Sequence, residues 1–173
     1  MRRLRSVVPT VAPIEWDRPI RIQFRDSLAT PSGGEVHAAS HLRNRIVMLD
    51  PALRSDRPEL SRIAVHEAFH FAWLRLGNPA RRSFELVLAA ERKRRARGEL
   101  GWSAESRKLA LRATDVRNRT RAWREYVCES FCDTAAWLYA GLRQHPEFTL
   151  APRFSRQRRA WFEHQLERGK FLT

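Results

Sequence analysis

The sequence has few cysteines and no long apolar run. Its 173 residues include only two cysteines, which excludes a disulfide framework and predicts a reducing compartment, the cytoplasm. No stretch approaches the roughly eighteen consecutive apolar residues of a transmembrane helix, so we expect no membrane span. Pro9, Pro13, Glu15 and Asp17 interrupt any apolar core behind the basic first residues, which argues against a secretory signal.

Acidic residues are also fewer than basic ones. Thirty-three Lys and Arg face nineteen Asp and Glu, which gives a formal net charge of +14, and thirty of the basic residues are Arg. A surface of this charge attracts polyanions, so nucleic acid and acidic protein segments are candidate partners. Charge alone does not choose between them, because the arginine excess fits the base composition of a genome as well as phosphate recognition.

The hydrophobic pattern predicts strands first and helices afterwards. Alternation of apolar and polar residues predicts a strand at 19–25. After the turn chemistry of 30–34, we expect a second strand at 35–40 and a third at 45–49. Helical spacing predicts helices at 56–76, 81–97, 103–113, 119–142 and 154–168. This order indicates an α+β class, with a small N-terminal antiparallel sheet followed by a mainly helical part. We expect one domain over residues 1–173, in which residues 1–17 form an extended arm that could cover a cleft.

One short motif has a clear chemical meaning. His66-Glu67-Ala68-Phe69-His70 matches HExxH within the predicted helix 56–76. Two histidines four residues apart stand one helical turn apart on the same face, where both imidazoles can share a metal ion. Glu67 lies about 100° round the helix from His66, beside a water on that metal. The alternative is that both histidines are ordinary core or surface residues of an amphipathic helix.

A second constellation supplies the further ligand that a zinc site requires. Glu125, Glu129 and Asp133 recur every four residues in the apolar predicted helix 119–142. Acidic side chains on a core-facing helix are costly unless they are paired or bound to metal. Catalytic zinc is typically held by three protein ligands, with water in the fourth position. The competing interpretation is a surface stripe that forms i,i+4 ion pairs with nearby arginines.

With these two motifs, residues 44–141 resemble the gluzincin metallopeptidases, and most closely the small bacterial minimal gluzincins. In that family a second helix carries a glutamate ligand with an aspartate one turn later, here Glu129-Ser-Phe-Cys-Asp133. The resemblance implies a zincin-like core with one Zn²⁺ per chain held by His66, His70 and Glu129. It also implies Glu67 as general base and Asp133 as orienting partner of a ligand histidine, with Glu125 as fallback ligand.

The resemblance further implies hydrolysis of peptide or protein substrates, by an endopeptidase in preference to an exopeptidase. By analogy, the strand 45–49 would hold the substrate backbone. The chain departs from the family pattern in its long basic segment 71–128, and it has no clear motif for a transition-state His or Tyr. Four residues are candidates for that role without a choice among them: Tyr126, Tyr139, His145 and His164. We expect His37 and His41 to have surface or core roles.

Three other functions stay open at this point. The chain could be a nucleic-acid-associated protein whose basic helices bind phosphate, in which case binding would fall steeply with salt. It could be a protease that its arginines localise to nucleic acid or to a regulator. It could also be a non-hydrolytic metal-binding module, which would keep zinc without cleavage that depends on Glu67.

Overall fold

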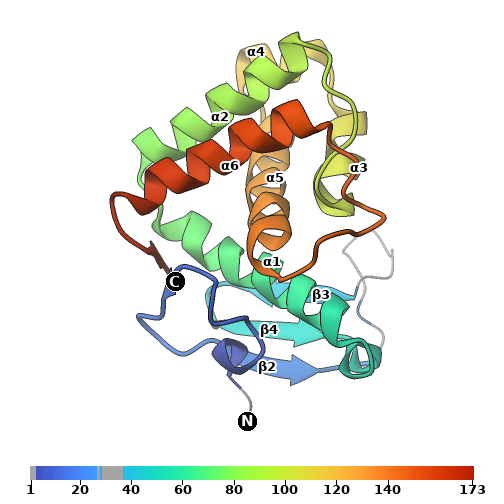
Figure 1. The fold of residues 1–173 in the computed structure, drawn as a ribbon, viewed down its shortest axis with the longest axis vertical. Coiled ribbons are helices and arrows are strands. Elements are labelled where there is room, and N and C mark those ends of the chain that lie inside the picture. Colours follow the sequence, from blue (N-terminus) through green and yellow to red (C-terminus); the bar gives the residue numbers. More distant parts are fainter. Residues whose placement is uncertain (1–2, 27, 29–36) are drawn as a thin grey trace.

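The computed structural model describes residues 3–26, 28 and 37–173, and shows a mixed α+β fold in which helices stack on a small sheet (Figure 1). The α-helices of the described residues are α1 (Arg57–Arg75), α2 (Asn78–Lys93), α3 (Trp102–Ala110), α4 (Ala113–Asn118), α5 (Arg121–Tyr139) and α6 (Pro152–Leu166). Five of them correspond to predicted helices, while α4 lies between two predicted helices and was not predicted. Within the described residues, no helix has the length and apolar character needed to cross a membrane.

The main sheet contains β2 (Arg21–Phe24), β4 (Ile46–Leu49) and β3 (Ala38–His41), in that order. β3 and β4 are antiparallel, but β2 runs parallel to β4, so the prediction of a wholly antiparallel sheet is wrong. The short turn between β3 and β4 forces an antiparallel pair. The parallel strands β2 and β4 are joined by residues 25–45, which include β3 and exceed the dozen or so residues that a parallel pair needs. The hydrophobic pattern within a strand does not show whether its neighbour runs parallel or antiparallel to it.

The strand beside α1 is β3. It is an edge strand of the described sheet, and Ser40 on it donates a hydrogen bond to Glu67 on α1. β4, which we expected to hold a substrate backbone, lies in the middle and pairs on both sides. That expectation is therefore wrong, since a central strand has no free edge. The predicted turn at 30–34 and residues 35 and 36 of the predicted strand 35–40 lie outside the described residues.

Helix α1 begins with a strong start signal and then enters the core. The side chain of Asp56 accepts a hydrogen bond from the backbone N–H of Glu59, and Pro58 occupies the first turn, where its missing N–H costs nothing. All residues from position 62 to position 69 are buried, including His66 and Glu67. Polar groups at such positions require partners, and α5, which crosses α1, supplies several of them (Figure 1).

The N-terminal segment contributes several side chains to the core. After the short 3₁₀ helix η1 (Leu4–Ser6), strand β1 (Ile14–Glu15) pairs in parallel with β5 (Phe171–Leu172). Leu4 is completely buried and Ile14 is nearly so. The arm also bridges to β2 through Arg3, on the side of the sheet opposite β3. At Arg3 the segment therefore lies at the edge of the sheet formed by β2.

Candidate metal centre

The structure brings the two histidines of the HExxH motif and one acidic residue of α5 together. The Nε2 atoms of His66 and His70 lie 3.1 Å apart. Glu129 Oε2 lies 3.3 Å from Nε2 of His66 and 3.8 Å from Nε2 of His70. Three potential donor atoms of the types that bind transition metals thus face a common point. The arrangement could hold a metal ion.

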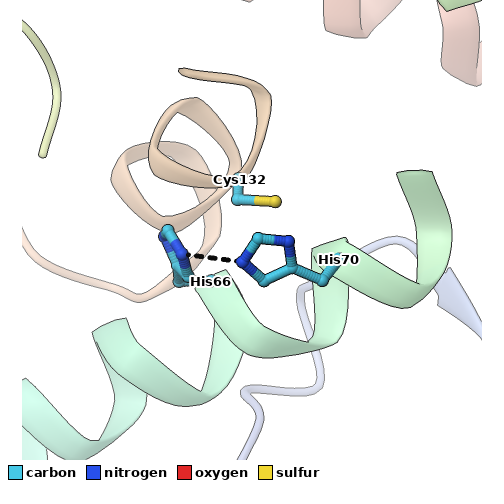
Figure 2. A group of neighbouring side chains, drawn as sticks. All are labelled: His66, His70 and Cys132. Carbon is cyan, nitrogen blue, oxygen red and sulfur yellow. Dashed lines mark hydrogen bonds between the residues drawn. The ribbon is translucent and has the colours of Figure 1, made fainter. Parts of the chain in front are cut away.

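Cys132 is a fourth potential donor that the sequence analysis did not assign. One ligand atom each of His66, His70 and Cys132 lie within 4.8 Å of one another, and Cys132 projects from α5 toward the two rings (Figure 2). Its side chain is completely buried. A sequence signal was available, because Cys132 follows Glu129 by three residues and therefore shares its helix face.

Asp133 orients the first histidine. Its Oδ1 accepts a hydrogen bond from Nδ1 of His66 at 2.7 Å, which leaves Nε2 to face the other donors. Its Oδ2 accepts from the backbone N–H of Ala104 at 2.8 Å, in the first turn of α3. Asp133 is 1% exposed, so both oxygens depend on these partners. Hydrogen bonding of this kind fixes the tautomer and direction of a ligand histidine.

One of the donors, His66, and its partner Asp133 line a cleft of about 340 Å³. Its lining includes Ala38 of β3, His66 and Glu67 of α1, and Trp102 at the start of α3. Glu67 lies in this lining beside Ser40, and has no part in the donor group. His37, which we had expected in a surface or core role, lines the cleft as well. Glu67 thus lies on the same helix as the two histidines and faces the cleft that His66 also lines.

Arg107 holds the other oxygen of Glu129. Its Nη2 lies 3.1 Å from Oε1 of Glu129, and it reaches this position from α3. Burial by itself would raise the pKa of Glu129, but a hydrogen bond from His66 and the charges of His70, His66 and Arg107 lower it to about 2. Glu129 is therefore ionised at neutral pH. No pattern in the sequence marked Arg107, since its role depends on how α3 sits on α5.

The histidines hold protons readily when no metal competes for them. Burial opposes protonation of His66, but the charges of Asp133 and Glu129 outweigh it and raise the pKa well above the usual 6.5. Burial likewise opposes protonation of His70, yet contact with Cys128, whose Sγ lies 3.7 Å from its Nδ1, raises the pKa to about 8. A metal must displace these protons, so metal affinity is expected to fall with falling pH.

A buried ion network holds the segment that leads into α3. Arg158 on α6 is completely buried and donates two hydrogen bonds to each of Glu91 and Glu99. Lys108 also pairs with Glu99, at 2.9 Å. Glu99 precedes Gly101, the residue at the start of α3, by two positions. The network therefore fixes the backbone that donates to Asp133.

The remaining predicted candidates lie elsewhere. Glu125, the fallback ligand, is half exposed and pairs with Arg121 at 2.7 Å, as the surface-stripe interpretation predicted for it. Tyr126 is buried and donates to Glu99, Tyr139 stacks on Phe69, and His164 pairs with Glu167 on the surface.

His145, the fourth transition-state candidate, lies next to a residue that lines the cleft. Together with Glu59 and Glu147 it forms a second group of potential metal donors, and Glu147 lines the cleft. However, Arg62 already pairs with both of these carboxylates, at its Nη1 and Nη2 atoms. The guanidinium offsets one of the two negative charges that a cation would use and occupies oxygens of both carboxylates.

Searches of protein-family models, of curated proteins and of solved structures find no significant match to this chain.

Proposed function

We propose that the protein is a zinc metallopeptidase of gluzincin type that cleaves peptide bonds within its substrates. The observation that carries the proposal is the convergence of three donor atoms beside the cleft that Glu67 lines. The Nε2 atoms of His66 and His70 lie 3.1 Å apart, and Oε2 of Glu129 lies 3.3 Å from the first and 3.8 Å from the second. Two imidazoles and one carboxylate form a ligand set used by catalytic zinc.

The donor chemistry supports zinc in particular. Imidazole nitrogen and carboxylate oxygen are both zinc ligands, and Asp133 already holds His66 in the tautomer that presents Nε2. Zinc held there would polarise a substrate carbonyl and make a water molecule acidic enough to lose its proton near neutral pH. The two free cysteines beside the donors favour a reducing compartment, so we place the activity in the cytoplasm.

Residues of the chain itself would perform the proton transfers. Glu67 would take a proton from the attacking water and return it to the leaving amine, acting first as a general base and then as a general acid. Ser40 holds Glu67 by a hydrogen bond and so restricts its rotamer. β3 would align an extended substrate along the cleft, since it is the strand of the described sheet that lies against α1.

The first test is metal content, measured by elemental analysis on protein purified without added metal or affinity tag. Wild type should contain about one zinc per chain, Glu129→Ala should lose it, and Glu125→Ala should keep it, because Glu125 lies outside the donor group. No zinc in any sample after reconstitution would contradict the proposal.

The second test concerns the assigned base. Glu67→Gln should keep the zinc and the fold but lose hydrolysis of a peptide mixture, because an amide cannot accept the proton. His70→Ala should lose the metal. Turnover of the Glu67→Gln variant at the wild-type rate would mean that another group is the base.

A second candidate function rests on Cys132. If its thiolate completes the set of ligands, no position is left for water, and the protein is a non-hydrolytic metal-binding module. Absorption spectroscopy of the cobalt-substituted protein distinguishes the two functions, because thiolate ligands give an intense charge-transfer band in the near ultraviolet. The peptidase proposal expects that band to be absent from wild type. A band that Cys132→Ser abolishes and Cys128→Ser retains would favour the module.

A further inference from the structure

A second and larger cavity, of about 690 Å³, lies where the C-terminal end of α1 meets α2 and the first half of α5. It shares no lining residue with the cleft beside the metal centre. Four arginines line it, two from α2 and one each from the end of α4 and from α5: Arg81, Arg82, Arg119 and Arg124. Glu85 is the acidic residue of this lining.

The charges in the cavity do not cancel. Glu85 is buried and accepts from both Nε and Nη2 of Arg119 at 2.8 Å, and it also pairs with Arg82 at 2.8 Å. One carboxylate thus serves two guanidinium groups. Arg124 is exposed and has no ion-pair partner among the described residues. The lining carries a net charge of +3, that is, four arginines less one glutamate.

Two of the four arginines, Arg81 and Arg119, are also held in place. Arg81 donates from Nε to the carbonyl of Trp73 at 3.0 Å and from Nη2 to the carbonyl of Leu74 at 2.8 Å, and so caps the end of α1. Arg119 has a left-handed backbone (φ 48°), a conformation that costs a non-glycine residue energy, and its guanidinium is locked on Glu85. An anion entering the cavity would meet groups that are already oriented.

One wall of the cavity is apolar. Trp73 and Val127 line it, and the guanidinium of Arg81 lies over the Trp73 ring at 5.4 Å from its centre. The volume lies within the range of small-ligand pockets, about 300 to 1,000 Å³, and exceeds what a single carboxylate needs. The lining therefore matches a ligand that combines a flat apolar group with several negative oxygens.

We propose that this cavity binds a nucleoside phosphate, either free or as one nucleotide of a single-stranded nucleic acid. The guanidinium fork matches phosphate oxygens in pairs, and an aromatic side chain offers a surface on which a base can stack. The proposal is independent of the peptidase function. A protease with such a site would be localised to, or regulated by, nucleotides through a surface separate from its cleft.

The test is fluorescence anisotropy with a labelled twelve-nucleotide single-stranded DNA and the full chain. The variant is Arg82→Ala/Arg124→Ala, and the matched control is Arg153→Ala/Arg156→Ala, which removes the same charge from exposed positions on α6. The cavity variant should bind at least about tenfold more weakly, and the control should change by less than about twofold. The slope of log affinity against log salt should fall by about 0.7 for each phosphate that the variant no longer neutralises.

Competition distinguishes the two sources of the ligand. Displacement of the DNA by adenosine monophosphate supports a site for free nucleotides, while displacement by unlabelled DNA alone supports a nucleic-acid segment. Equal weakening in the cavity variant and the control would overturn the proposal in favour of general charge attraction, as would equally effective competition by polyglutamate. If the double variant does not fold, Arg124→Glu alone serves, since Arg124 is exposed and unpaired among the described residues.

Discussion

Gly101 and Asp133 approach each other so closely that no other residue fits at position 101. A Cβ added to Gly101 would lie 2.2 Å from Cγ of Asp133 and 2.4 and 2.5 Å from its two oxygens. Since Asp133 holds His66, glycine at position 101 is required both by the fold and by the candidate metal centre.

The first prediction follows from that contact. Gly101→Ala should displace the Asp133 carboxylate, lower the melting temperature and weaken zinc binding, because His66 loses its fixed orientation. Gly77→Ala is the control, since its added Cβ would meet only Pro79, at an ordinary 3.7 Å. Calorimetry and zinc titration provide the two measurements. Normal zinc affinity in Gly101→Ala would show that Asp133 tolerates the displacement.

The second prediction tests Asp133 itself. Asp133→Asn should weaken zinc binding by about 10- to 100-fold, which is typical when the partner of a ligand histidine is replaced. Glu125→Gln on the same helix should leave the affinity unchanged, because Glu125 pairs with a surface arginine. Competition with a chelator of known affinity measures both. An equal loss of zinc affinity in the two variants would show that Asp133 has no special role in zinc binding.

The third prediction concerns the buried network. Arg158→Leu should reduce the free energy of unfolding by about 3 to 5 kcal/mol, since it leaves Glu91 and Glu99 buried without their main partner. Arg156→Leu, two residues away and exposed, should change it by less than about 0.5 kcal/mol. Urea denaturation followed by circular dichroism gives both values. Similar free energies of unfolding in the two variants would mean that Lys108 alone is a sufficient partner for the buried carboxylates.

The fourth prediction is a dependence of stability on acid. Burial opposes ionisation of Glu99, but Arg158 and Lys108 outweigh it and lower its pKa from the usual 4.5 to about 2. The group contributes stability that is fully present above pH 4.5, its pKa in the unfolded chain, and is lost as the pH falls toward 2. Urea midpoints should therefore decline more steeply between about pH 5 and pH 2 in wild type than in Glu99→Gln. Parallel declines would assign the acid sensitivity to other carboxylates.

The sequence was most informative where local signals sufficed. The cap at Asp56, the proline at 58 and the four-residue spacing of His66 and His70 depend only on neighbours along the chain, and the helix α1 follows from them. The same spacing rule brought Glu129 and Asp133 to the side of α5 that meets α1. It did not separate them from Glu125, because a helix turns by about 40° more than one full turn over four residues.

Features that depend on tertiary packing were beyond prediction. Nothing in a strand's alternation tells whether β2 runs parallel to β4, and nothing near Arg107 or Ser40 shows that each will contact an acidic residue of the candidate site. The long basic segment 71–128, read from the sequence as a departure from a family pattern, supplies α3, whose first turn holds Asp133. That contact depends on how α3 packs against α5, which the sequence of the segment does not show.

The pairing of β1 with β5 has a consequence for the order of folding. Ile14 meets Phe171 across most of the sequence, and the Phe171 ring contacts Phe69 and Phe131, which lie on the two central helices. Closing a loop of this size costs conformational entropy before the contact is made, and contacts of high sequence separation slow folding. We therefore expect the N-terminal segment to dock after α1 and α5 have packed against each other.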